Sequence, residues 1–255
     1  VNEWDWDSVK ATSMEGTAIV LKGHIGAIVR RNDIHNFFNG IYTGSSADRN
    51  NPELAFDIDV YDNYFHQISD DALEPEGACV NHRFRNNLID DAFVGVSLAP
   101  VSIGPTWVLH STFANYTGRG IKWDRASDGF AFIYHNTFWT QEKDIAAMDF
   151  IAPADNGIIY NNIFQNTSYG VYEVQVGSEH HNWNHNNWYT TKNPDFKWEG
   201  ASYANIKELC ASYGLDCNSH SEEPELQNPS EGDFTLLPTS PNIDRGVSIP
   251  GINDN

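Results

Sequence analysis

The sequence has few of the residues that build disulfide frameworks, membrane spans or nucleic-acid surfaces. Only three cysteines occur among 255 residues, and their spacing fits neither a disulfide framework nor a zinc site. No apolar run approaches the roughly 18 residues that a membrane-spanning helix needs, so we expect no membrane insertion. Basic residues number 15 against 35 acidic ones, for a net charge of −20. Because phosphate binding needs a basic face, this charge argues against nucleic acid as a partner.

The cysteines and the first residues bear on the compartment. Cys210 and Cys217 stand close enough in sequence to close a small loop in an oxidising compartment, and two free thiols are the alternative. Cys79 is then expected to be an unpaired, buried thiol. No basic-then-apolar signal segment stands at Val1, so we expect any secretion signal to have been removed or to lie outside this sequence. We expect a secreted protein, either extracellular or periplasmic.

A short motif, asparagine followed two residues later by a large apolar residue, recurs along the chain. It occurs at Asn32/Ile34, Asn63/Phe65, Asn87/Ile89, Asn136/Phe138, Asn162/Phe164 and Asn186/Trp188, with Ser111/Phe113 in the remaining slot. Successive anchors are 31, 24, 24, 25, 26 and 24 residues apart. A bulky residue precedes each anchor by three positions, and a small residue followed by an apolar one comes eight or nine positions after most anchors.

This repeat predicts the fold. The apolar stretches between Asn, Gly and Asp are short and show no sustained helical period, which is typical of strands joined by tight bends. One coil buries little by itself, whereas stacked coils share a continuous core. The sequence therefore predicts an all-β protein, a right-handed parallel β-helix of about seven to nine coils of ~25 residues. The recurring asparagine is expected to form an interior ladder, with a structural rather than a catalytic role.

The ends of the chain differ from its middle. We expect a single domain over residues 1–255, with an irregular N-terminal coil or cap at 1–26 and regular coils at 27–200. The C-terminal cap, residues 201–255, is expected to hold a short helix from Tyr203 to Tyr213 and an extended tail that covers the open end of the sheets. A monomer is expected.

The coils, the helix and the tail sequence GDFTLLPTSPNIDRG together resemble the secreted bacterial right-handed β-helix proteins of the pectate-lyase-like superfamily. The resemblance covers residues 27–250. It implies the fold and a role with carbohydrate, so a polysaccharide or oligosaccharide is the expected partner. That superfamily includes lyases, hydrolases, epimerases and proteins with no known reaction, so the resemblance leaves the activity open.

Equivalent positions of stacked coils lie about 4.8 Å apart, so the repeat places polar residues in columns. The position after the small–apolar pair holds Tyr42, Glu74, Ser97, Lys122, Ala147 and Tyr172, and the position two residues on holds Gly44, Glu76, Ala99, Asp124, Asp149 and Val174. We therefore expect the ionisable residues of both columns to share one outward face. Small Ser97 and Ala99 are expected to leave a shallow groove there.

Four carboxylates lie within seven residues of the segment ISDDALEPEG, and they are Asp70, Asp71, Glu74 and Glu76. Carboxylates this close repel one another unless a cation lies between them, as in calcium sites. Bound calcium is one interpretation of this segment, and a solvated acidic bend is the other. Calcium would also bridge to an acidic sugar that a protein of net charge −20 otherwise repels.

Lys122 is the main catalytic candidate, and Asp124, in the same segment, is a second catalytic candidate. A desolvated lysine can abstract a proton, and a lysine can also hold a sugar carboxylate. The alternative is a plain ion pair with Asp124 and Glu74. For substrate binding we expect Arg119 and Arg125 to hold a uronate carboxylate, with Asp149 on the same face.

Histidines and aromatic residues give further candidates. One residue before each anchor, a third column includes His110 and His135, which could serve as base or acid; packing at the bends is the alternative. Four aromatic residues are expected to be exposed and to stack on sugars: Tyr42, Trp123, Trp139 and Tyr172.

Two family patterns match parts of these segments. Glu74-x-Glu76 is similar to the Glu-x-Glu calcium motif of the chondroitinase B and alginate lyase family, but the positions of that family's catalytic Lys and Arg hold residues such as Val80 and Leu98. Asp70-Asp71 and Gly120-Ile121-Lys122 look like the Asp-Asp and Arg-Ile-Lys elements of polygalacturonases, whose Gly-His-Gly histidine is missing here.

Three functions follow as alternatives. The first is a polysaccharide lyase that cleaves uronate-containing glycan by β-elimination. The second is a glycoside hydrolase that uses a carboxylate pair from the same face. The third is a non-catalytic module that binds glycan or displays a surface. A lyase product absorbs ultraviolet light, a hydrolase produces only reducing ends, and a binding module produces neither.

Overall fold

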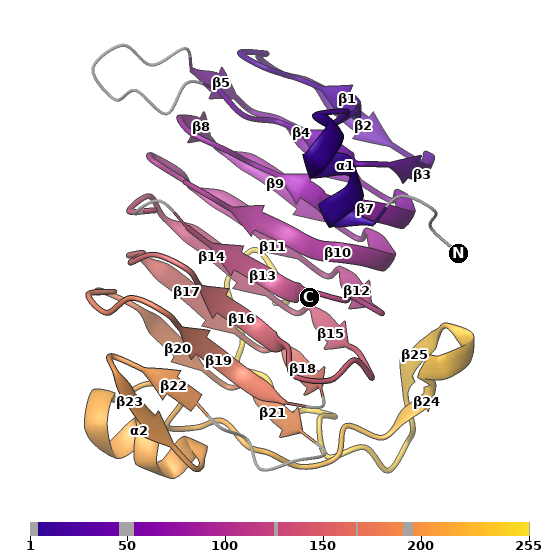
Figure 1. The fold of residues 1–255 in the computed structure, drawn as a ribbon. Coiled ribbons are helices and arrows are strands. Elements are labelled where there is room, and N and C mark those ends of the chain that lie inside the picture. Colours follow the sequence, from indigo (N-terminus) through magenta and orange to yellow (C-terminus); the bar gives the residue numbers. More distant parts are fainter. Residues whose placement is uncertain (1–4, 46–53, 125–126, 167, 191–195, 255) are drawn as a thin grey trace.

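The computed structural model describes residues 5–45, 54–124, 127–166, 168–190 and 196–254. The chain winds into a parallel β-solenoid of about seven turns, consistent with the right-handed β-helix that the repeat predicts (Figure 1). Two sheets run the length of the solenoid, and their strands pair in parallel from coil to coil, except that β23 pairs antiparallel with β22 at one end. No helix of the described residues is long and apolar enough to cross a membrane.

Each coil gives one strand to the smaller main sheet, which has seven strands. Its strands are β2 (Ile28–Arg30), β6 (Asp59–Tyr61), β9 (His82–Arg85), β11 (Thr106–Leu109), β14 (Ala131–Tyr134), β17 (Gly157–Tyr160) and β20 (Asn182–Asn184). The bulky residues three positions before the anchors are paired here, as Val60 with Phe84 and Val108 with Ile133 show. They form one side of the core.

The large sheet has fourteen strands and wraps around a corner of the coil. β7 (Tyr64–Glu74) and β10 (Leu88–Leu98) run through this corner unbroken. In the other coils the same path is divided between two strands. These are β1 (Thr17–Val20), β3 (Asp33–Phe37), β4 (Asn39–Tyr42), β12 (Thr112–Ala114), β13 (Arg119–Trp123), β15 (Thr137–Trp139), β16 (Ala146–Phe150), β18 (Ile163–Asn166), β19 (Tyr169–Glu173), β21 (Asn187–Thr190), β22 (Phe196–Trp198) and β23 (Ala201–Tyr203).

The asparagine ladder lies inside the solenoid, as the repeat predicts. Asn136 Nδ2 donates to Val108 O at 2.8 Å and to Asn162 Oδ1 at 3.0 Å, and Asn162 repeats the pattern with Asn186. Ser111 fills its slot because its hydroxyl accepts from the backbone N–H of Asn87 at 3.1 Å. The ladder satisfies backbone groups at a buried bend, where unpaired polar atoms would be costly.

The large apolar residues of the motif stack as a second interior column. The rings of Phe113, Phe138, Phe164 and Trp188 follow one another with centroids 4.5, 4.9 and 4.0 Å apart. All four are fully buried. The strand spacing sets this stacking, because equivalent residues of neighbouring coils point in the same direction and lie one strand spacing apart.

The first 26 residues are more regular than the sequence predicts. Helix α1 (Trp6–Thr12) begins at the capping residue Asp5, and β1 then pairs in parallel with β4. The missing signal is the asparagine motif, which starts only at Asn32. The solenoid therefore begins before residue 27.

The C-terminal region begins at the last coil, and its tail then runs back along the solenoid, where the backbone N–H of Val247 donates to Asn161 Oδ1 (Figure 1). Helix α2 (Ile206–Tyr213) carries Cys210, which forms a disulfide with Cys217, while Cys79 is free and buried. The backbone N–H of Trp188 donates to His220 O, so the segment after the helix continues the sheet edge. The tail adds the β24 (Leu226–Asn228) and β25 (Asp233–Leu236) hairpin and a 3₁₀ turn (Pro229–Glu231); the remaining short pair is β5 (Ala55–Phe56) with β8 (Cys79–Val80).

Candidate functional site

One row of outward-facing side chains crosses the large sheet. The strand register places Tyr42 beside Glu74, Ser97 beside Lys122, and Asp149 between Lys122 and Tyr172. We call these residues and the next one along, Lys197, the charged row: Tyr42, Glu74, Ser97, Lys122, Asp149, Tyr172 and Lys197. The row faces outward because the residues on both sides of Lys122 in the chain, Ile121 and Trp123, are fully buried.

The register corrects one column of the sequence prediction. Asp149, rather than Ala147, is the neighbour of Lys122, because Met148 pairs with Ile121. Ala147 instead takes the small position beside Gly120, where a Cβ on the glycine would lie 2.8 Å from Ala147 O. The segment Ile145-Ala146-Ala147-Met148 contains no glycine to mark the small position of the repeat. More than one pair of its residues can therefore be aligned with the small–apolar pair of the other coils.

Lys122 of the row and Arg119, at the start of the same strand, are each paired with a carboxylate of another coil. Lys122 Nζ lies 2.8 Å from Asp71 Oδ2, and Arg119 Nε lies 2.9 Å from Asp149 Oδ2. Lys122 therefore pairs with Asp71, which lies on the same strand as the expected partner Glu74, and the charge of Lys122 also acts on Glu74. These contacts make Lys122 and Arg119 charged donors on the sheet face.

Glu74 is a carboxyl group whose protonation differs strongly from that of a free side chain. Burial, followed by the charges of Asp71 and Glu76, raises the pKa of Glu74 to about 8. Lys122 opposes the shift but does not cancel it. Asn39 Nδ2 donates to Glu74 Oε2 at 3.1 Å. Glu74 is thus a neutral acid at pH 7, able to donate a proton.

The four acidic residues proposed to hold calcium are not gathered around one point. Among the residues that the structure describes, the group whose ligand atoms come within 4.8 Å of one another is Asp33, His35 and His66, and the acidic four do not form such a group. The chain's own cations lie beside them instead. Lys122 pairs with Asp71, and Lys10 of α1 lies 3.7 Å from Asp70. Burial and the charge of Asp71 raise the pKa of Asp70 to about 6.

His110 and His135 lie at a different corner from Lys122. They occupy the bends before the anchors, and all seven residues of their column have left-handed backbone, with φ between 48° and 60°. Asn, Asp and His are the non-glycine residues that adopt this conformation most readily, which accounts for the column. The two rings stack at 5.0 Å, and the C-terminal tail covers them, with Val247 bonded to neighbouring Asn161. Burial lowers the pKa of His135 to about 4.

Several expected sugar-binding residues have other positions. Trp123 is fully buried and stacks on Phe150 at 5.3 Å, and Trp139 is 4% exposed, so neither is a surface aromatic. The alternation of the strand points Trp123 inward whenever Lys122 points outward. Tyr42 and Tyr172 are half-buried members of the row, and Asp124 is half-buried beside it. Arg125 lies outside the described residues.

The group of Asp33, His35 and His66 was missed in the sequence. His35 and His66 each follow a ladder asparagine by three positions, so the same repeat places them side by side. This column is distinct from the one that directly precedes the anchors, which holds His110, His135 and His185. The signal was therefore present in the spacing.

Comparison with known proteins gives one match. The family model described as "Periplasmic copper-binding protein (NosD)" matches residues 5–205. No curated protein and no solved structure matches the chain. The periplasmic location of that family and the Cys210–Cys217 disulfide agree with the expected place outside the cytoplasm. Because the match spans most of the 255 residues, the chain belongs to the NosD family.

Proposed function

We propose that the protein binds acidic, uronate-containing polysaccharide along the charged row. The observation that carries this proposal is the succession of a tyrosine, a glutamate, a serine, a lysine, an aspartate, a second tyrosine and a second lysine over adjacent coils. Coils are spaced about 4.8 Å apart, close to the length of one sugar unit in an extended glycan. A polysaccharide that lies across the coils can therefore repeat its contacts in step with them.

The local charge supports an acidic ligand in spite of the net charge of −20. Three of the 15 basic residues, Arg119, Lys122 and Lys197, lie on this one face. Arginine and lysine bind carboxylates by charge-assisted hydrogen bonds, and the Arg119 and Lys122 side chains already bind carboxylates of the protein. A sugar carboxylate can compete for the same donors. Lys197 Nζ lies 4.6 Å from the centre of the Tyr172 ring. The two residues together offer a sugar an apolar ring surface and a charged group.

Binding assays with matched ligands test this function. We expect uronate-rich oligosaccharides of alginate, pectin or chondroitin type to bind in a salt-dependent way, and neutral glucans of the same length to bind weakly. Lys197→Met and Tyr172→Ala should each weaken binding, whereas Lys207→Met on α2 should not. Equal binding of neutral and acidic glycans, or no binding to either, would contradict the proposal.

Glu74 favours cleavage by β-elimination as a second candidate function. Elimination needs a proton donor for the leaving glycosidic oxygen, a base for the hydrogen beside the sugar carboxylate, and cations that stabilise the charge. Neutral Glu74 suits the first role, Asp71 the second, and Lys122 the third. In this reaction the C–H bond breaks with its proton passing to the base, the bond to oxygen breaks with a proton passing from Glu74, and a C=C bond forms.

The products distinguish the activities. Ultraviolet-absorbing unsaturated uronate that disappears in Glu74→Gln would establish the lyase. Reducing ends without this absorbance would establish a hydrolase, and binding without either product would leave the protein as a glycan-binding module.

No step of the elimination uses a metal. Copper, which the family's description names, prefers imidazole ligands. The charged row has no histidine, whereas Asp33, His35 and His66 offer two.

A further inference from the structure

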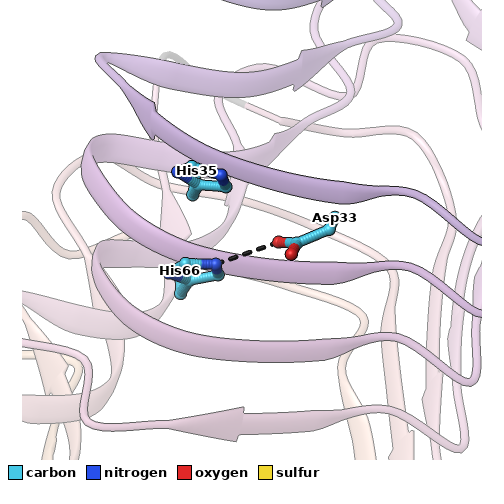
Figure 2. A group of neighbouring side chains, drawn as sticks. All are labelled: Asp33, His35 and His66. Atoms are coloured by element: carbon cyan, nitrogen blue, oxygen red, sulfur yellow. Dashed lines mark hydrogen bonds and ion pairs between the residues drawn. The ribbon is translucent and has the colours of Figure 1, made fainter.

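Three side chains with metal-ligand chemistry converge on the outer face of the first two complete coils. β3 pairs with β7 so that His35 lies directly beside His66, with Asp33 beside Tyr64. Figure 2 shows the two imidazoles one above the other and the Asp33 carboxylate directed toward His66. The ligand atoms of the three residues lie within 4.8 Å of one another.

The group is accessible from solvent yet held in place. Asp33 and His35 are exposed, and the His66 side chain is 24% exposed. His66 Nε2 lies 2.9 Å from Asp33 Oδ1. The His66 ring stacks with His35 and with Tyr64, and the centroids are 4.6 Å apart in each pair. Strand pairing and ring stacking therefore fix the imidazoles before any ion arrives, which lowers the conformational cost of binding.

Asn36 supplies an outer contact to the group. Its Nδ2 atom lies 2.7 Å from His35 Nδ1. With the amide turned over, Asn36 Oδ1 would accept the proton of Nδ1 and leave Nε2 free to bind a metal, which is the arrangement usual for ligating histidines. Asn36 lies within β3 and has left-handed backbone at φ 59°, so the strand is irregular at the residue that contacts the ring.

A second pair of histidines provides an internal comparison. His110 and His135 also stack across neighbouring coils, at 5.0 Å, but their neighbour is Asn161 rather than a carboxylate. Stacking alone therefore recurs in the solenoid wherever histidines occupy the same column. The feature particular to the first coils is the anionic third ligand, which favours a divalent cation.

We propose that Asp33, His35 and His66 bind one divalent first-row transition metal ion. Two imidazoles and one carboxylate suit such ions better than calcium or magnesium, which prefer oxygen ligands. Among divalent ions, Cu(II) binds a given nitrogen and oxygen site most tightly. The ion would link β3 to β7, and it would fasten the first coil to the second. The site is separate from the charged row and does not depend on glycan binding.

Titration of the untagged protein with Cu(II) in a competing buffer tests the proposal. We expect one ion per chain by calorimetry, an electron paramagnetic resonance spectrum with nitrogen coupling, and a higher melting temperature. The double variant His35→Asn/His66→Asn should lose at least about tenfold in affinity together with the nitrogen coupling. The matched control is His110→Asn/His135→Asn, because asparagine already occupies that column at Asn86 and Asn161. It should bind as the wild type does.

Asp33→Asn keeps the test decisive if the double histidine variant fails to fold. Its side chain is 64% exposed, so the substitution should leave the fold intact while it weakens Cu(II) binding by about tenfold. The proposal is overturned if the wild type binds no Cu(II) against the buffer. It is equally overturned if the folded histidine or Asp33 variants retain the wild-type affinity and spectrum, since the ion would then lie on other histidines.

Discussion

Lys122 Nζ donates to both carboxylate oxygens of Asp71, at 2.8 and 3.0 Å, across the strand that separates their coils. The small side chain of Ser97, which lies beside Lys122 on the intervening strand β10, gives the lysine room to reach over it. The pair is largely buried, with 16% of the Lys122 side chain and 3% of the Asp71 side chain exposed. It joins three successive coils on the outside of the solenoid.

The burial of this pair predicts a large stability cost for breaking it. Lys122→Ala leaves the Asp71 carboxylate buried without its partner, which costs about 3–5 kcal/mol in comparable pairs. Adding Asp71→Asn to Lys122→Ala should restore part of that loss, because no uncompensated charge then remains. Denaturant unfolding of the two single variants and the double variant measures the coupling.

The control for this cycle is the Arg83–Asp59 ion pair on the smaller sheet. Its two side chains are 31% and 21% exposed, so Arg83→Ala should cost only about 0–1 kcal/mol. If Lys122→Ala costs no more than Arg83→Ala, the lysine is a surface residue and the packing described for Asp71 is wrong.

Glu74 predicts a particular dependence of stability on pH. Its pKa is about 8 in the folded protein and 4.5 for the free group, so between these values the folded chain holds a proton that the unfolded chain has released. Folding then takes up a proton, and the contribution of Glu74 to stability falls as the pH rises from about 4.5 to 8. Glu74→Gln should remove that loss.

Unfolding free energies at pH 5 and pH 9 test the effect. The Gln variant should exceed the wild type in stability at pH 9 by up to several kcal/mol, since one pKa unit corresponds to about 1.4 kcal/mol. At pH 5 the two should be similar. Exposed Glu231, changed to Gln, is the control and should change neither value. Parallel pH curves for wild type and Glu74→Gln would show that Glu74 is ionised in the fold.

The asparagine ladder predicts which substitutions the interior bend tolerates. Asn136→Leu removes the donor to Val108 O and the acceptor of the Ser111 N–H, and unmet buried groups cost about 1–3 kcal/mol each. Asn136→Ser should cost less, because the Ser111 hydroxyl already takes the acceptor role in its own slot, where it accepts from the backbone N–H of Asn87. Melting temperatures should therefore fall in the order wild type, Ser, Leu. A Leu variant as stable as the Ser variant would mean that the ladder bonds contribute little.

The fold could be predicted from the sequence because the motif of a polar ladder residue and an apolar core residue occurs seven times. A polar side chain that bonds the next coil must recur at one spacing, so Asn63, Asn87 and Asn136 could be aligned without any structure. The alternation of strands likewise placed Glu74 and Lys122 on one face. The error at Asp149 arose where the pattern was ambiguous, in a coil without glycine.

Side-chain reach and capping elements could not be predicted in this way. Lys122 was expected to pair with Asp124 and Glu74, yet its ammonium group lies on Asp71, which precedes Glu74 by three residues on β7. Helix α1 brings Lys10 toward Asp70, and nothing in the repeat signals where a segment outside it will lie. The identity of charge partners therefore depends on distances between side chains, which the aligned sequence repeat does not give.

Trp123 gives the sharpest test of which aromatic residues contact a glycan. The sequence suggested an exposed stacking platform, whereas the structure buries the ring completely against Phe150, with His181 at its edge. Trp123→Ala should therefore cost about 3–5 kcal/mol through the cavity that it leaves. Trp123→Phe should cost less and should leave glycan affinity unchanged once the protein is folded, because the ring has no exposed face. Tyr172→Ala should have the opposite profile, with a small change in melting temperature and a clear loss of affinity. Measuring both quantities on both variants decides the matter, and a folded Trp123→Phe protein that no longer binds glycan would restore Trp123 to the binding surface.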